Sequence, residues 1–193
     1  MISAIVLAAG KSSRMGAENK MLLAFKGSTV IGSVINALEL SIVNEIIIVD
    51  NKETSIKGHL NNLGSLKFVT NLDSEQGLTT SIQCGIRAAS ESTSGYLICL
   101  GDMPLLTYSE YNTLVNNYLS SKTIAILIPT FKNKRGNPVL FSAHFKDEIL
   151  QLQEKNGCKP VVASNDDYVI EIPFPNNNCH LDIDTKEDYK QFK

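Results

Sequence analysis

The chain has 193 residues, of which 43% are hydrophobic and 20% charged, and its formal net charge is −2. This length suits one domain with a substantial core, and the near-neutral charge argues against a general binder of nucleic acid or anionic membranes. No apolar run is long enough to cross a membrane, and the first residues lack the basic region and cleavage site of a secretory signal. We therefore expect a cytoplasmic protein, in agreement with four cysteines that show no C-x-x-C spacing.

Short runs rich in β-branched residues alternate with segments whose apolar residues recur at helical spacing. The runs expected to form buried strands are Ala4–Leu7, Glu45–Val49, Leu66–Thr70, Tyr96–Leu100 and Ile124–Pro129. The helical segments between them are Val30–Leu40, Thr79–Ala89 and Ser109–Leu119. This alternation indicates a mostly parallel sheet that is covered by helices on both faces.

The last third of the chain predicts a smaller extension of the same domain. A strand, a helix and a strand are expected at Val139–Phe141, Phe145–Leu152 and Tyr168–Ile172. The segment HLDIDTKEDYKQF reads as the end of a strand followed by a helix, which Thr185 and Asp188 open as a weak capping box. Residues 1–193 are thus expected to form a single domain.

The first loop contains Gly10, Lys11 and Ser12, the letters that end an ATP-binding P-loop. A P-loop needs a second glycine five positions earlier, where this chain has Ile5. The dinucleotide pattern G-x-G-x-x-G fails as well, because Ser12 stands where its second glycine is required. What remains is a strand that runs into a turn of small residues, followed by two cations, Arg14 and Lys20, within reach of an anion.

Ligands of parallel α/β sheets bind outside the carboxyl ends of the strands, so binding and catalytic residues are expected in the segments that follow each strand. These segments are Ala8–Lys20, Asp50–Asn51, Asn71–Thr80, Gly101–Leu106, Lys132–Pro138 and Asp182–Asp184. Asp102 directly follows a central strand, where its carboxylate could hold Mg²⁺ or simply cap the next turn. The strand period of two places Asp182 and Asp184 on one side, either to share that metal or to cap the last helix.

Two further segments have both a functional and an ordinary interpretation. Gly77 precedes a helix whose first turn carries Thr80 and Ser81, which could present donors to an anion or a base edge, or could merely cap the helix. The basic loop Lys132–Pro138 could bind a second phosphate-bearing substrate, or could simply be solvated.

Taken together, these motifs resemble the nucleotidyltransferase superfamily, and most of all the molybdenum cofactor cytidylyltransferases and their close relatives. The matching segments are Leu7–Gly10, Ser12, Arg14–Gly16 and Asn19–Lys20; Gly77–Leu78, Thr80–Ser81 and Gly85–Ile86; Gly101–Pro104; Arg135–Phe141; and Asp182–Thr185 with Glu187–Asp188. They follow the family order and span nearly the whole chain. The resemblance implies a three-layer α/β/α Rossmann-like fold with a mainly parallel mixed sheet and at least one antiparallel strand near the C-terminus.

The resemblance also implies roles for individual residues. Arg14, Lys20 and Asp102 would be catalytic, Asp102 and Asp184 would hold Mg²⁺, and Arg135 and Asn137 would bind the acceptor. The residues expected to bind the nucleotide are Leu7, Ala8, Ala9, Gly10, Ser12, Arg14, Lys20, Asn71, Gly77, Thr80 and Ser81. The implied reaction moves CMP from CTP to the phosphate of molybdopterin and releases pyrophosphate. The enzyme that receives the resulting cofactor, its client, would be a molybdenum hydroxylase.

Three alternatives stay open at this point: guanylyl transfer to the same cofactor, nucleotidyl transfer to another acceptor such as a sugar 1-phosphate, and a non-catalytic cofactor chaperone. The guanylyl branch usually carries Gly-Gly in its first loop, where this chain has Ala9 and Gly10. Asn137 stands where many relatives have His, which bears on the identity of the second substrate.

Overall fold

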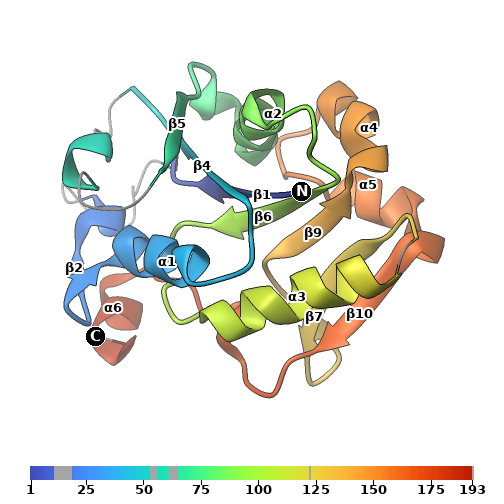
Figure 1. The fold of residues 1–193 in the computed structure, drawn as a ribbon. Helices are drawn as coiled ribbons and strands as arrows, with labels where there is room; N and C mark the ends of the chain where they lie inside the picture. Colours follow the sequence, from blue (N-terminus) through green and yellow to red (C-terminus); the bar gives the residue numbers. More distant parts are fainter. Residues whose placement is uncertain (11–18, 53–55, 61–64, 122, 193) are drawn as a thin grey trace.

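A computed structural model describes residues 1–10, 19–52, 56–60, 65–121 and 123–192 of the chain (Figure 1). Its centre is an eight-stranded sheet in the order β10-β7-β9-β6-β1-β4-β5, with β8 paired to β7. The strands are β1 (Ile2–Leu7), β4 (Glu45–Asp50), β5 (Lys67–Thr70), β6 (Gly95–Leu100), β7 (Ile126–Phe131), β8 (Lys134–Arg135), β9 (Val139–Ser142) and β10 (Val169–Pro173). Strands β1, β4, β5 and β6 are parallel, and β9 lies antiparallel between β6 and β7. The expected mixed, mainly parallel sheet is confirmed.

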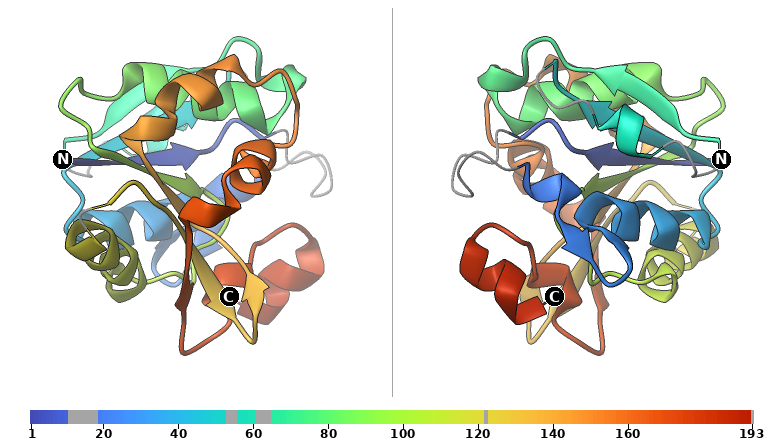
Figure 2. Two further views of the ribbon diagram at one scale, coloured as in Figure 1. Left: turned by 90° about the vertical axis from the view of Figure 1, so that its right-hand side faces the viewer. Right: turned by 90° about the vertical axis from the view of Figure 1, so that its left-hand side faces the viewer.

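Helices cover both faces of the sheet, as Figure 2 shows. The α-helices are α1 (Val30–Glu39), α2 (Leu78–Ala88), α3 (Tyr108–Ser121), α4 (Lys146–Gln151), α5 (Lys159–Ser164) and α6 (Lys186–Phe192). One core cluster joins α1 and α3 to one face of the sheet, and a second joins α2, α4 and α5 to the other. Short 3₁₀ helices occupy η2 (Lys20–Leu22), η3 (Lys57–His59), η4 (Ser74–Gln76), η5 (Ala143–Phe145), η6 (Asp166–Tyr168) and η7 (Asn178–His180).

Strand β1 shows why the sheet needs both layers. All six of its residues are buried, and their side chains alternate between the two core clusters: Ala4 and Val6 join one, while Ile5 and Leu7 join the other. A strand that is buried on both faces reads as a continuous apolar run, which is why the sequence predicts it well.

The structure corrects several details of the sequence-based expectation. Strand β7 begins at Ile126 instead of Ile124, and helix α5 and the hairpin of β2 (Ala24–Phe25) and β3 (Ser28–Thr29) were not expected. The strand expected before the last helix is absent: residues 181–184 form no ladder, and the amide of Ile183 donates to the carbonyl oxygen of Asp102 at 2.9 Å.

The capping box of the last helix is confirmed. The amide of Asp188 donates to Oγ1 of Thr185 at 3.1 Å, and the amide of Thr185 donates to Oδ2 of Asp188 at 2.8 Å. The Thr185 hydroxyl, at 2.8 Å, and then the Thr185 amide donate to the Asp188 carboxyl and lower its pKa. Helix α6 therefore starts at a fixed point directly after Thr185.

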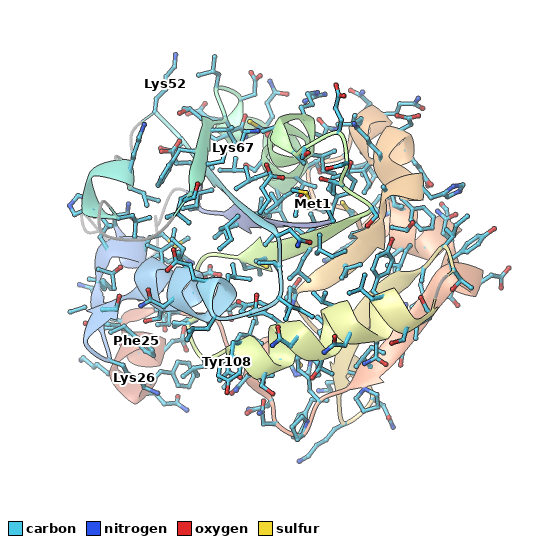
Figure 3. All side chains as sticks on the ribbon, in the orientation of Figure 1. Met1, Phe25, Lys26, Lys52, Lys67 and Tyr108 are labelled. Atoms are coloured by element: carbon cyan, nitrogen blue, oxygen red, sulfur yellow. The ribbon has the colours of Figure 1, made fainter. Side chains whose placement is uncertain are left out.

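A small satellite core fastens this C-terminal segment to the β2–β3 hairpin. Phe25, Val30 and Ile183 are buried together, and Tyr189 of α6 donates its hydroxyl to the carbonyl oxygen of Ala24 at 2.7 Å. Figure 3 shows Phe25 at the hairpin, beside α6. Because the side chain of Ile183 points into this core, the side chains of its neighbours Asp182 and Asp184 lie on the opposite side of the segment.

Gly85 of α2 lies directly against the sheet, where a Cβ atom would be 2.3 Å from Cγ2 of Ile5 and 3.1 Å from Cγ2 of Val49. We expect Gly85→Ala to lower the free energy of unfolding by about 1–3 kcal/mol through overpacking, although alanine itself favours a helix by about 1 kcal/mol. Urea unfolding would measure the change. Arg87→Ala, at an exposed position of the same helix, is the control and should stay within about 0.5 kcal/mol of wild type. A Gly85→Ala protein as stable as wild type would show that α2 can move away from the sheet.

Among the described residues, no helix has both the length and the apolar character needed to cross a membrane.

Candidate active site

The carboxyl ends of β1, β4, β5 and β6 meet at one edge of the sheet, and the expected site residues gather there. Asp102 lies in the turn that follows β6, and the amide of Gly101 donates to the carbonyl oxygen of Leu7 at 3.0 Å. This bond holds the turn after β6 against the end of β1. The turn of small residues after β1, Ala8–Gly10, therefore lies next to Gly101 and Asp102.

Lys20 joins two acidic segments that are distant in the sequence. Its Nζ atom lies 2.6 Å from Oδ2 of Asp102 and 2.7 Å from Oδ1 of Asp184. Burial by itself lowers the pKa of Lys20, but the attraction and hydrogen bonds of Asp102 and then Asp184 outweigh that effect, and the pKa is raised. The ammonium group is therefore charged at neutral pH.

Three carboxylates come together around this lysine. Oxygen atoms of Asp102, Asp182 and Asp184 lie within 4.8 Å of one another. Burial, and next the charge of Asp102, raise the pKa of Asp182. Both acids of the Asp-Ile-Asp segment, Asp182 and Asp184, thus lie close to Asp102. Asp184 also forms a salt bridge with Lys20.

The chemistry of this set fits a hard divalent cation. Mg²⁺ and Mn²⁺ prefer carboxylate oxygens, and Mg²⁺ is usually held by one or two carboxylates together with substrate phosphates. Oδ1 of Asp102 is buried and accepts no hydrogen bond from the described residues. A buried carboxylate oxygen without a donor is costly, and a metal ion would satisfy it.

The first loop forms the next part of the site. Ala8 and Ala9 are buried, the amide of Ala8 donates to the carbonyl oxygen of Val49 at 2.8 Å, and the side chain of Asn51 donates to the carbonyl oxygen of Ala9 at 2.8 Å. Gly10 is exposed, and no atom of the other described segments lies within 4 Å of where a Cβ would stand. The expected contacts of Ser12 and Arg14 lie outside the described residues.

The structure brings Asn71, Thr80 and Ser81 together at the start of α2. Nδ2 of Asn71 lies 2.9 Å from the hydroxyl oxygens of both Thr80 and Ser81, to which it donates. Oγ1 of Thr80 also lies 3.0 Å from the carbonyl oxygen of Gly77. Gly77 has a φ of +111°, and a Cβ there would stand 2.6 Å from the carbonyl oxygen of Lys155, so only glycine fits.

Arg135 and Asn137 line a cavity of about 470 Å³ on the face of the sheet that α2 and α5 cover. The guanidinium group of Arg135 is already engaged: Nε lies 2.7 Å from Oε1 of Glu171, and an Nη atom lies 3.1 Å from Oδ1 of Asp166. Hydrogen bonds to Glu171 and then Asp166 raise the pKa of Arg135. The basic loop expected at Lys132–Pro138 is mostly the β7–β8 hairpin and the turn that follows it.

Sequence reasoning missed two polar residues of this cavity, Asn156 and Lys159, because it did not predict α5. A signal was present in the sequence: Asn156 and Gly157 form a turn dipeptide, and Pro160 stands in the first turn of the helix, where proline is favoured.

Residues 4–168 match the model of the MobA-like NTP transferase domain. The chain belongs to this family. The resemblance to the nucleotidyltransferases that the sequence motifs indicate is therefore confirmed.

Two relatives of this MobA-like transferase match it over nearly their whole lengths. The molybdenum cofactor cytidylyltransferase of Escherichia coli K12 is 29% identical over 97% of this chain and 93% of its own length. A probable molybdenum cofactor guanylyltransferase of Thermococcus sibiricus is also 29% identical, over 98% of this chain and 96% of its own. The relatives thus include both base specificities.

The fold of this MobA-like transferase is shared with Rv0371c of Mycobacterium tuberculosis H37Rv in its complex with manganese. The two structures superpose with a TM-score of 0.83 at 21% identity, over 99% of this chain and 97% of the other. The expected α/β nucleotidyltransferase fold is confirmed.

Proposed function

We propose that this MobA-like transferase moves CMP from CTP to the phosphate of a molybdopterin-type acceptor and releases pyrophosphate. The observation that carries the proposal is the cluster of Lys20, Asp102 and Asp184 at the carboxyl edge of the sheet, beside a cavity of small-molecule size. A protein that only bound or delivered the cofactor would not need a buried ammonium group held between two carboxylates.

In this reaction an oxygen of the acceptor phosphate attacks the α-phosphorus of CTP in line, and the bond to pyrophosphate breaks. Such a transfer needs little covalent help, so positioning and charge neutralisation supply most of the rate. Lys20, and Arg14 from the first loop, neutralise the triphosphate, while the backbone of Leu7–Gly10 positions the nucleotide.

Asp102 is the first candidate to hold Mg²⁺, with Asp184 or Asp182 beside it. When bound, the ion would neutralise charge on the phosphates. The fit rests on the unsatisfied buried oxygen of Asp102 and on the three carboxylates that face one another. We place the reaction in the cytoplasm and propose a molybdenum hydroxylase as the client of the product.

The preference for CTP is supported by the first loop and by the start of α2. Ala9 stands before Gly10 where the guanylyl branch usually has Gly-Gly, and we expect the side chains of Thr80 and Ser81 to leave room for a pyrimidine base but not for a purine. Asn71 fixes both hydroxyl groups.

The test is pyrophosphate release from CTP, GTP and UTP, each offered with molybdopterin, with molybdenum-loaded cofactor and with a hexose 1-phosphate. We expect release with CTP and a molybdopterin-type acceptor. Preference for GTP would give the guanylyl reaction instead. Preference for the hexose 1-phosphate would change the acceptor, and no release from any pair would support the chaperone alternative.

Replacing Thr80 and Ser81 together by alanine is expected to reduce the preference for CTP over GTP by about 10–100-fold, because a polar contact to the base is worth about 1–3 kcal/mol when its loss leaves a buried partner unpaired. The ratio of kcat/KM for the two nucleotides measures the change. Ser109→Ala, at an exposed position of α3, serves as the control. An unchanged ratio in the double variant would mean that the base is read elsewhere.

A further inference from the structure

The cavity of about 470 Å³ adjoins the cluster of Lys20 and the acids without being part of it. Leu7 and Leu100, the last residues of β1 and β6, lie in its lining, and Asp102 follows Leu100 by two residues. A ligand in this cavity would therefore lie next to the segments that hold the nucleotide and the acids. The volume is that of a pocket for a single small molecule.

Most of the cavity wall is apolar, and its few polar residues are either cationic or neutral. Besides Leu7 and Leu100, large apolar side chains come from α2 and from strands β6, β7 and β9: Leu78, Ile82, Ile98, Ile128, Val139 and Phe141. The polar side chains are two cations, Arg135 and Lys159, and two amides, Asn137 and Asn156, and no carboxylate belongs to the described lining. Such a wall suits a flat apolar body that carries negative charge, whereas the hydroxyl groups of a sugar would lose hydrogen bonds to water without replacement.

The two cations, Arg135 and Lys159, differ in the salt bridges that they form. Arg135 is paired with Glu171 and Asp166, whereas Lys159 makes no salt bridge within the described part of the chain. In the same part of the chain, the side-chain amides of Asn137 and Asn156 make no hydrogen bond. Lys159 and Asn156 are both exposed, so Lys159 offers the cavity a charge that no described carboxylate pairs with, and Asn156 offers it donors and an acceptor that no described protein group occupies.

The segment that carries Asn156 and Lys159 is fixed to the start of α2. The amide of Leu78 donates to the carbonyl oxygen of Lys155 at 2.9 Å, and the amide of Gly157 donates to Oγ1 of Thr79 at 3.0 Å. The side chain of Gln83 donates to the carbonyl oxygens at the end of α4, those of Ile149 and Leu152, at 3.0 Å each. Asn156 and Lys159 therefore lie within two residues of Gly157, which is anchored on the helix that begins at the nucleotide turn.

We propose that this cavity binds the fused heterocycle of the acceptor, that Asn156 pairs with its amide-like edge, and that Lys159 binds its phosphate. The inference rests on the proposed function and adds acceptor-specificity residues that no sequence motif indicated. Arg135 lines the cavity, but its guanidinium group stays in its salt bridges with Glu171 and Asp166.

The first test measures binding without turnover. A pterin that carries a phosphate monoester, and the same pterin without the phosphate, would be titrated by fluorescence anisotropy. We expect Lys159→Met to weaken binding of the phosphorylated pterin about tenfold or more, since hydrogen bonds to charged groups are the strong ones. Binding of the neutral pterin should not change. Lys146→Met, at a lysine of α4 outside the cavity, is the matched control. Equal losses for both pterins would overturn the role of Lys159.

A second variant tests the cavity itself. Ala163 lines it from an exposed position on α5, so Ala163→Phe should fill the space without disturbing the core. We expect it to abolish binding of the pterin phosphate while CTP still binds. A hexose 1-phosphate that displaces the pterin phosphate equally well from wild type, or unchanged binding by Ala163→Phe, would overturn the inference.

The two proposals can fail separately. If wild type transfers CMP to a molybdopterin acceptor but Lys159→Met and Ala163→Phe keep the wild-type acceptor KM, the function stands and the cavity assignment falls. If wild type binds the pterin phosphate and loses it in both variants but transfers no nucleotide, the proposed reaction falls and the binding site stands.

Discussion

Asp102→Ala is expected to reduce nucleotidyl transfer by about 10³-fold or more while the protein stays folded, because metal-assisted charge stabilisation is worth several kcal/mol. The variant removes the buried oxygen that accepts no hydrogen bond from the described residues and one of the two carboxylates of Lys20. Asp184 still contacts Lys20, so no buried charge is left alone. The fold should therefore survive the change.

Transfer rates at several Mg²⁺ and Mn²⁺ concentrations would measure the effect, and thermal unfolding would verify the fold. Loss of the free Mn²⁺ signal in electron paramagnetic resonance, with CTP present, would report metal binding without catalysis. Asp102→Asn keeps the shape of the side chain and removes its charge. Asp167→Ala is the control, because Asp167 is exposed and lies 65 positions after Asp102 in the sequence. An active Asp102→Ala enzyme would remove the metal assignment.

Lys20→Ala is expected to lower kcat by about 30- to 1,000-fold, the equivalent of about 2–4 kcal/mol for one charge-assisted contact to the transition state. The reason is that its ammonium group is the one described cation placed between Asp102 and Asp184, where the triphosphate would arrive. Separate values of KM for CTP and for the acceptor are needed. Lys26→Ala, at an exposed lysine in the β2–β3 turn, controls for general charge loss. A defect confined to acceptor affinity would place Lys20 on the other substrate.

The sequence predicts the buried parallel strands well, because a strand that is covered on both faces has no polar residues to obscure its pattern. It misses the hairpin of Ala24–Phe25 and Ser28–Thr29, since two-residue strands show no period. The position of β9 between β6 and β7 is likewise hidden, because strand order depends on packing between distant segments. Helix α5 has only six residues, too few for a helical repeat to appear.

The acidic residues of the site could be located from the sequence, but their arrangement could not. Alternation places Asp182 and Asp184 on one side of an extended segment, and this holds although the segment forms no strand. That Lys20 contacts both Asp102 and Asp184 depends on the fold, because the three residues lie on separate segments that meet only at the edge of the sheet.

The position of Lys20 has a consequence for the order in which ligands arrive. The lysine acts as an internal counter-ion for the acidic cluster of Asp102, Asp182 and Asp184. A divalent ion that binds these carboxylates alone must overcome the charge of this ammonium group, which already contacts Oδ2 of Asp102 and Oδ1 of Asp184. The triphosphate of an incoming nucleotide offers the lysine a new anionic partner and frees the carboxylates at the same moment. We therefore expect metal and nucleotide to be thermodynamically linked, so that each raises the affinity for the other, and we expect the affinity for a metal ion alone to be low.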